Sequence, residues 1–166
     1  MKTRSTLRFS APADLVSQML IDPKFYTMIG EDLKAKDCTT VPGPDQISAT
    51  YQLVTADVLR PVVGPESHLT TQLTWTTPLT GGRRQGELAI SLERLPATFT
   101  AEVRLTHEAG LTVVTYDLTL KIKIPLLGGK LEKKAAEKLQ VVIDAGQDIG
   151  QRWLADHGVN QTADSS

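Results

Sequence analysis

Side chains able to carry out chemistry are few in this 166-residue sequence, and they lie far apart. Cys38 is the only cysteine, so the chain can form neither an intrachain disulfide nor a thiolate metal cluster. The three histidines, His68, His107 and His157, show none of the spacings typical of metal ligands, such as HExxH. Serine and threonine are abundant, but no GxSxG motif marks a nucleophile. We therefore predict no catalytic residues, no metal site and no cofactor.

The stretch "PLLGGKLE", residues 125–132, contains two adjacent glycines, which could form an anion site at the start of a helix. It matches neither GxGxxG nor GxxxxGK[ST]. An alternating run ends at Pro125 and a run of helical period follows, so a strand-to-helix turn is the better interpretation. Glu132, early in that helix, either interacts favourably with the helix dipole or points inward as a buried acid.

Composition places the chain among ordinary globular domains, with 40% apolar residues, 22% charged residues and a formal net charge of −1. That balance provides no field to gather nucleic acid or anionic lipid, and no basic patch stands out in the linear sequence. The opening "MKTRSTLRFS" lacks the apolar core of a signal peptide, and no apolar run is long enough to span a membrane. We expect a cytoplasmic protein that binds no nucleic acid and does not insert stably into membranes.

Alternation of apolar and polar residues predicts a sheet in the first three quarters of the chain. Residues 2–10 form a first strand, and Pro12 and Pro23 each open a short helix. From about residue 34 to residue 124 the alternation continues over several long runs, separated by turns such as "LTGGRRQG" and "EAGL". Each run has one polar face, which is typical of antiparallel strands rather than of buried parallel ones.

A single long helix of about 25 residues, spanning ~40 Å, is predicted after residue 130. Its apolar face contains Ala135 and Gly146, with Gly150 on or beside it, although a helix-interior glycine costs ~1 kcal/mol relative to alanine. Three explanations stay open: close approach of the helix to a strand, a kink, or a hollow between helix and sheet. Only 5% of the residues are aromatic, so few large side chains are available to fill such a hollow. A cavity smaller than about 300 Å³ would count heavily against ligand binding there.

This order of elements, with "IKIPLLGGKLEK" at 122–133 and a helix ending "GQRWLADHG", resembles the START-like superfamily, also called SRPBCC or Bet v 1-like. More narrowly, it resembles a bacterial family of unknown function within that superfamily. The resemblance implies an α+β helix-grip fold, in which a curved antiparallel sheet wraps around a long C-terminal helix and two short helices follow the first strand. We expect a domain over residues 1–157 and a flexible tail over 158–166, which has no apolar period.

The resemblance also implies a deep apolar cavity that binds a small hydrophobic or lipid-like molecule. We favour non-catalytic binding as the function, with such a molecule as the partner. The alternative is a polyketide cyclase-like or hydrolase-like enzyme acting in the same cavity, and a third possibility is a protein-interaction module using the outer face of the sheet. The fold by itself does not choose among these functions or define the oligomeric state.

The expected cavity lining consists of the residues that should face inward from the strands and from the apolar face of the helix. The lining residues are Tyr51, Leu53, Leu73, Trp75, Leu88, Ile90, Phe99, Ala101, Val103, Tyr116, Leu118, Leu120, Leu139, Val142, Gly146 and Ile149. Three of these residues, Tyr51, Trp75 and Tyr116, could either present a hydrogen-bonding tip to the cavity or serve as ordinary core. His107 and Glu132 are the possible polar contacts. The apolar stretches at 23–30 and 57–66 either gate the cavity or add to the core.

Overall fold

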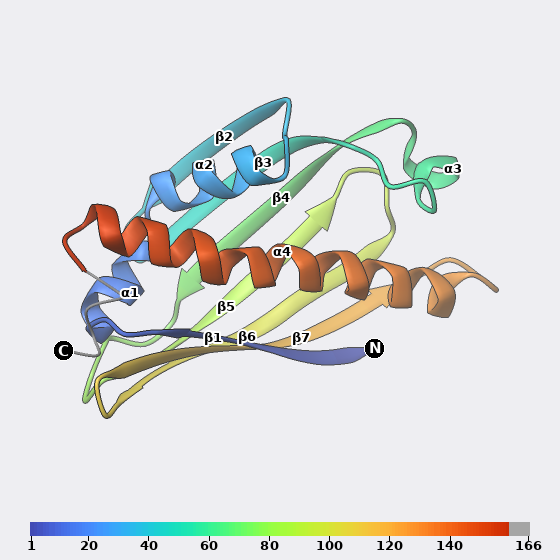
Figure 1. Ribbon diagram of the computed structural model, residues 1–166. Helices are drawn as coiled ribbons and strands as arrows, with labels where there is room; N and C mark the ends of the chain where they lie inside the picture. The colour runs from blue at the N-terminus through green and yellow to red at the C-terminus, as the bar shows by residue number, and fades with distance from the viewer. Residues whose placement is uncertain (160–166) are drawn as a thin grey trace.

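The fold consists of one antiparallel sheet wrapped around a long helix, as seen in a computed structural model that describes residues 1–159 (Figure 1). The predicted tail lies outside the described residues from residue 160 onward. In chain order the elements are β1 (Lys2–Phe9), α1 (Ala13–Met19), α2 (Pro23–Asp32), β2 (Asp37–Gly43), β3 (Gln46–Val54), α3 (Arg60–Val63), β4 (Glu66–Trp75), β5 (Arg83–Leu92), β6 (Ala97–Glu108), β7 (Leu111–Ile122) and α4 (Gly128–Asp156).

The seven strands follow the order β1-β7-β6-β5-β4-β3-β2, and every neighbouring pair is antiparallel. Strands β2 to β7 form a meander, and the last strand, β7, pairs with the first strand, β1 (for example Leu7 opposite Val114). The edges are therefore β1 and β2, and Pro42 lies in the edge strand β2, where its missing N–H costs no interior ladder bond. The predicted helix-grip fold class is confirmed.

Local sequence explains why these strands form. Along β7 the side chains of Tyr116, Leu118 and Leu120 are buried, while Thr119 and Lys121 lie on the other face, which is the period of two expected for a half-buried strand. The β6–β7 hairpin closes through a two-residue turn, Ala109 and Gly110, in which both residues have positive φ. Positive φ at both positions is the signature of a type I′ turn, whose twist matches that of the strands.

Helices α2 and α4 cover the inner face of the sheet (Figure 1). They are joined by Asp22, the N-cap of α2. One carboxylate oxygen of Asp22 accepts from the backbone N–H of Lys24 at 3.2 Å, and the other accepts from Trp153 Nε1 at 2.7 Å. Trp153 is buried, and its ring stacks on His157 with 3.5 Å between the ring centroids. The C-terminal part of α4 is thus fixed to α2 by a side-chain cap.

The β7–α4 connection is a strand-to-helix turn, as predicted. Gly128 opens α4, and a Cβ atom there would lie 2.5 Å from the carbonyl oxygen of Ile122, so only glycine fits. Glu132 lies one turn further along α4. Its Oε2 accepts a hydrogen bond from the backbone N–H of Ile122 at 3.0 Å, and this contact ties the helix to the end of β7.

Candidate functional site

An apolar cavity lies between the sheet, α2 and the middle of α4. Its volume is about 80 Å³, well below the roughly 300 Å³ expected for a ligand pocket. The residues that line it are Leu7, Phe25, Tyr26, Ile29, Leu33, Tyr51, Leu69, Thr71, Leu73, Leu88, Ile90, Tyr116, Leu139, Val142, Ile143 and Gly146. Most of the space anticipated between sheet and helix is therefore filled by side chains in this structure.

The roof of the cavity is the least buried part of α4. Residues 137–145 contain no fully buried side chain, whereas Leu131 to Ala136 and Gly146 to Leu154 on either side contain several. Leu139, Val142 and Ile143 point their apolar side chains at the cavity yet remain only partly buried. Because apolar side chains gain free energy from complete burial, this segment of α4 is packed less firmly than the helix ends. One hydrogen bond ties it to the sheet: Ser5 Oγ of β1 donates to Gln140 Oε1 at 2.7 Å.

Three tyrosines from three elements meet at the cavity: Tyr26 of α2, Tyr51 of β3 and Tyr116 of β7. Burial raises the pKa of all three hydroxyls, and the pKa of Tyr26 is raised further by the nearby Tyr116 and Tyr51. At neutral pH these hydroxyl groups are therefore neutral donors. They contribute hydrogen-bonding capacity to the cavity and no charge.

Two of the three hydroxyl groups are already used. Tyr26 Oη donates to the carbonyl oxygen of Leu20 at 2.7 Å, and Tyr51 Oη donates to the carbonyl oxygen of Tyr26 at 2.8 Å. Tyr116 is only 7% exposed, and its hydroxyl has no hydrogen-bond partner among residues 1–159. Among residues 1–159, Thr55 Oγ1 is the only fully buried side-chain oxygen or nitrogen without a hydrogen-bond partner, so the Tyr116 oxygen keeps some accessible surface. Tyr116 therefore offers a free hydroxyl group that a ligand could bind.

The two glycines of the helix face have different roles. A Cβ atom on Gly150 would lie 2.6 Å from Phe9 Cε1, so close approach of helix and strand explains this glycine. A Cβ atom on Gly146 would have Leu7 Cδ1 at 3.6 Å as its nearest neighbour, an ordinary contact. Gly146 lines the cavity, so here the small residue leaves space rather than permitting contact.

The structure divides the expected lining into two groups. Tyr51, Leu73, Leu88, Ile90, Tyr116, Leu139, Val142 and Gly146 line the cavity. The others are packed in the core or against it without lining the cavity: Leu53, Trp75, Phe99, Ala101, Val103, Leu118, Leu120 and Ile149. Trp75, for example, donates from Nε1 to the carbonyl oxygen of Ser17 at 3.2 Å, away from the cavity.

Neither expected polar contact lies in the cavity. His107 is at the end of β6, where its Nδ1 lies 2.7 Å from Thr112 Oγ1. Both oxygens of Glu132 are used at the β7–α4 junction, by the N–H of Ile122 and by the amino group of Met1 at 3.4 Å. These contacts hold the pKa of Glu132 below its usual value, mainly through the backbone hydrogen bond. Glu132 is therefore a junction residue and not a buried acid.

The expected lining left out helix α2, which supplies Phe25, Tyr26, Ile29 and Leu33 to the cavity wall. The apolar stretch at 23–30 was expected either to gate the cavity or to add to the core, and the structure places residues of it in the wall. Thr71 was missed too. It occupies an inward position of β4, between Leu69 and Leu73, and its break in the apolar alternation marks a second polar group on the cavity wall.

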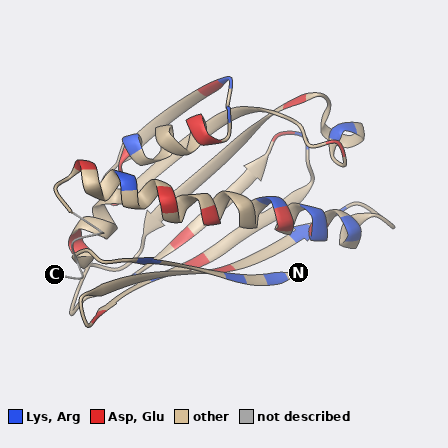
Figure 2. Ribbon diagram, in the orientation of Figure 1, with Lys and Arg blue, Asp and Glu red and all other residues tan. Residues whose placement is uncertain are grey.

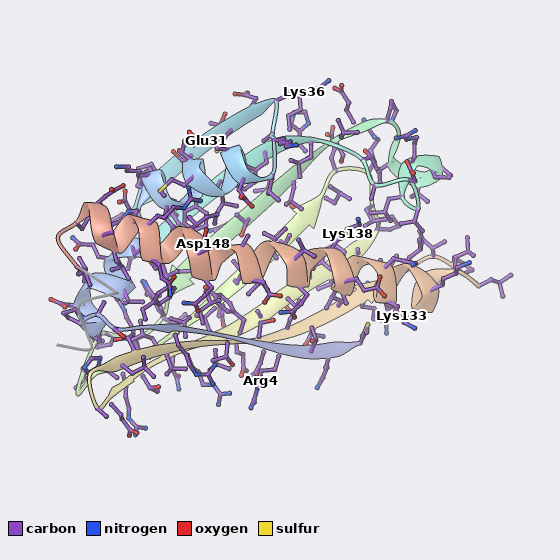
Figure 3. All side chains as sticks on the ribbon, in the orientation of Figure 1. Arg4, Glu31, Lys36, Lys133, Lys138 and Asp148 are labelled. Atoms are coloured by element: carbon purple, nitrogen blue, oxygen red, sulfur yellow. The ribbon has the colours of Figure 1, made fainter. Side chains whose placement is uncertain are left out.

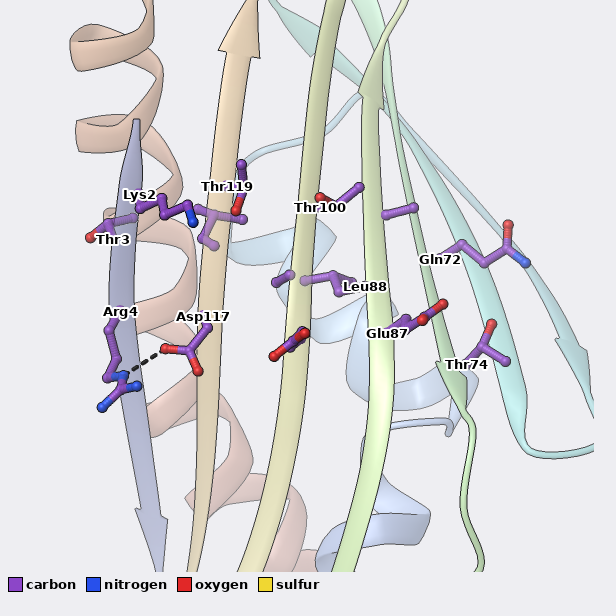
Figure 4. Close-up of a pocket in the computed structure, with 14 residues that line it drawn as sticks. Lys2, Thr3, Arg4, Gln72, Thr74, Glu87, Leu88, Thr100, Asp117 and Thr119 are labelled. Atoms are coloured by element: carbon purple, nitrogen blue, oxygen red, sulfur yellow. Dashed lines mark hydrogen bonds and ion pairs between the residues drawn. The ribbon is translucent and has the colours of Figure 1, made fainter.

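A second and larger hollow, about 990 Å³, lies on the outer face of the sheet and is open to solvent (Figure 4). Short side chains such as Thr100 and Thr119 form its floor, and charged side chains surround them. Asp117 is bound there by Arg4 at 2.6 Å and by Arg104 at 2.5 Å, and these arginines lower the pKa of its carboxyl group. A polar, open surface of this kind offers little burial to a hydrophobic molecule, so the inner cavity is the better candidate site.

Acidic and basic side chains do not line the inner cavity. Among residues 1–159, no aspartate, glutamate, histidine, lysine or arginine contributes to its wall. Over the same range, no histidine, cysteine, aspartate and glutamate side chains gather in a group able to hold a metal ion. No helix in this described part of the chain has the length and apolar content needed to cross a membrane.

Comparison with known proteins gives a family and a fold. A family described as "Protein of unknown function (DUF2505)" matches residues 4–154. No curated protein sequence matches the chain. Among solved structures, the protein TTHA0849 from Thermus thermophilus superposes with a TM-score of 0.63 at 17% identity, covering 94% of this chain and 99% of that one.

Two further solved structures carry informative descriptions. A START superfamily protein from Mycobacterium smegmatis has a TM-score of 0.58 at 15% identity, covering 89% of this chain and 94% of that one. A STAR-related lipid transfer protein from Xanthomonas axonopodis has a TM-score of 0.56 at 16% identity, covering 88% and 85%. At these identities the likeness shows the fold, which is that of the START-like superfamily.

Proposed function

Because the chain belongs to the family of unknown function DUF2505 and has a START-like fold, we propose that it binds a small hydrophobic molecule between its sheet and α4. The observation that carries the proposal is a mostly apolar cavity whose lining residue Tyr116 has a hydroxyl group with no hydrogen-bond partner within residues 1–159. Lipid transfer by a protein of the same fold is in accord with it.

The lining sets the chemistry of the ligand. Apolar side chains form most of the wall, and with no ionisable side chain other than tyrosine among its described residues the cavity would not compensate a buried charge. The ligand is therefore uncharged where it is enclosed, and it carries one hydrogen-bonding oxygen or nitrogen for Tyr116. Long-chain alcohols, ketones and similar lipid-like molecules have this combination.

A volume of about 80 Å³ cannot enclose such a molecule, so binding requires that the cavity widen. We propose that the segment 137–145 of α4 moves outward, since its side chains are incompletely buried while both ends of the helix are anchored. The anchors are Trp153 with Asp22 at one end and Glu132 with Ile122 at the other. The roof can then move while the helix stays attached, and the hydrogen bond from Ser5 Oγ to Gln140 Oε1 breaks as it does so.

Binding without catalysis fits the lining better than an enzyme does. A cyclase or hydrolase needs several ionisable groups that converge on its substrate. Tyrosine hydroxyls and the Thr71 hydroxyl are the polar side-chain groups of the lining, and they supply no general base that is ionised near neutral pH.

The test compares ligand binding by the native chain and by variants of the cavity. Native mass spectrometry of protein purified without added ligand should show a bound neutral species, and decanol should compete with the neutral dye Nile red. Gly146→Leu, which places a large side chain in the cavity, is expected to abolish both signals. Val141→Leu is the matched control, because Val141 lies on the exposed side of α4.

Tyr116→Phe gives the finer test. Losing one hydrogen bond of about 1 kcal/mol should weaken binding of decanol about fivefold, while binding of decane stays unchanged. If neither the native chain nor Tyr116→Phe binds any neutral apolar molecule, or if Gly146→Leu binds as well as the native chain, the proposed function is wrong.

A further inference from the structure

The β7–α4 connection forms an apolar tip, residues 124–127, that projects from the molecule. Leu126 is fully exposed and Leu127 half exposed (104% and 51%), and Pro125 is exposed as well. Leu126 also has a positive φ of 69°, an unfavourable backbone conformation for a residue with a Cβ atom. Neither feature contributes to packing of the domain, so the tip calls for an explanation outside the fold.

Lysines surround this tip and form a local basic cluster, which was not expected from the balanced charge of the whole chain. Between residues 121 and 138 the chain has six lysines and two glutamates, a net charge of +4, so the remainder of the chain carries −5. The cluster is visible as the blue half of α4 next to the tip in Figure 2, and Figure 3 labels Lys133 and Lys138 on that half. Lys130, Lys134 and Lys138 are spaced four residues apart, so they lie along one exposed side of the helix.

This placement of charge opposes the stability of α4. The first turn of the helix contains no acidic residue and the last turn no basic one. The N-terminal half, residues 128–142, contains four lysines and two glutamates, a net charge of +2. The C-terminal half, residues 143–156, contains three aspartates and Arg152, a net charge of −2. The positive end of a helix dipole disfavours nearby cations, so this order is the reverse of the stabilising one. A charge pattern that costs stability is best explained by a partner of opposite charge.

The geometry points to an anionic membrane surface as that partner: we propose that Leu126 and Leu127 insert at the lipid interface while the surrounding lysines bind the phosphate headgroups. Exposed leucines next to lysines are the combination used by proteins that lie on membranes. A nucleic acid would bind the lysines through its phosphate groups but would leave the exposed leucines in water, so it does not account for them. A protein partner usually needs about 800 Å² on each side, far more than two leucines and a proline offer.

Binding to vesicles tests the proposal directly, with or without a ligand in the cavity. The full chain is mixed with vesicles of phosphatidylcholine or of phosphatidylcholine with one quarter phosphatidylglycerol, and then centrifuged. We expect sedimentation with the anionic vesicles only. It should weaken at least tenfold between about 0.1 M and 1 M salt, where the screening length falls from about 10 Å to about 3 Å.

Two variants separate the contributions. Leu126→Ser with Leu127→Ser removes the apolar tip, and Lys130→Gln with Lys133→Gln and Lys134→Gln removes three charges, each worth about fivefold in binding. Each is expected to lower binding at least tenfold. The matched controls are Val141→Ser, an exposed apolar residue of α4, and the triple change Arg8→Gln, Lys24→Gln and Arg83→Gln. Both controls should bind as the native chain does.

An environment-sensitive fluorophore on the tip gives a readout that does not depend on affinity. Cys38→Ser removes the one native thiol, and Leu126→Cys then provides a single labelling site. Emission should shift to the blue on anionic vesicles. The proposal is overturned if the native chain binds no vesicles, if the label stays in water, or if the control triple variant loses binding equally. It is also overturned if the tip variants abolish a stoichiometric protein complex instead.

Discussion

Gly150 of α4 lies directly against Phe9 of β1: a Cβ atom at this position would be 2.6 Å from the phenylalanine ring. Phe9 is completely buried, so the ring has no room to move away. Gly150→Ala is therefore expected to lower the free energy of unfolding by up to about 2 kcal/mol. Overpacking costs ~1–3 kcal/mol, and alanine recovers ~1 kcal/mol of helix propensity.

Gly146→Ala is the matched comparison, because its Cβ atom would have ordinary contact with Leu7. Here the propensity gain should dominate and raise the free energy of unfolding by up to about 1 kcal/mol. Urea denaturation of both variants measures the difference. Equal effects of the two substitutions would show that the two glycines do not have separate roles.

The three cavity tyrosines should respond differently to loss of the hydroxyl group. Tyr116→Phe removes a hydroxyl group that has no hydrogen-bond partner within residues 1–159, so stability should stay within about 0.5 kcal/mol or rise. Tyr26→Phe and Tyr51→Phe each remove one hydrogen bond to a backbone carbonyl oxygen and should cost about 1 kcal/mol. Thermal or urea unfolding of the ligand-free variants is the measurement. A large loss for Tyr116→Phe would mean that its hydroxyl is bonded in solution.

Amide hydrogen exchange should find the roof of the cavity to be the weakest part of α4. Residues 137–145 have no fully buried side chain, and we expect their amide groups to exchange about tenfold faster than those of residues 149–154. Saturation with decanol should slow exchange in the roof and leave residues 149–154 unchanged. Uniform protection along the helix would contradict the proposed opening motion.

The junction between β7 and α4 should depend on pH through Glu132. Its pKa is lowered in the folded chain, so its ionised form stabilises the fold above the ordinary glutamate pKa of about 4.3. This contribution is lost as the pH falls through the lowered folded-state value. Glu132→Gln should therefore be less stable than the native chain at pH 7, and the difference should disappear in acid. A difference that persists in acid would indicate steric rather than electrostatic stabilisation.

Much of the fold could be predicted because its signals are local. The alternation that ends with Ile122 defines β7, and the period of 3.6 that follows defines α4, so the change from strand to helix is readable between Pro125 and Leu131. The polar outer face of each strand indicated an antiparallel sheet for the same reason. These patterns depend on residues close in sequence.

The site was harder to predict. Alternation along a strand shows which side chains face inward, but it does not show whether they line a cavity or pack in the core. Phe99 and Tyr116 both face inward from neighbouring strands, yet Tyr116 lines the cavity and Phe99 does not. The difference depends on what lies opposite each side chain, and that is set by helices distant in the chain. Likewise, Gly146 and Gly150 are equivalent in the sequence pattern. They differ in how close an added Cβ atom would come to the side chains of β1.

The sequence by itself determined the fold class, the order of the elements, and the apolar face that α4 turns toward the sheet, since each follows from a short-range period. The tertiary structure alone decided the small size of the cavity, the free hydroxyl of Tyr116 within residues 1–159 and the exposure of Leu126 beside the lysines. Those properties arise from distances between side chains on separate elements. No local period encodes such distances, because close packing is a property of all the contacting elements together.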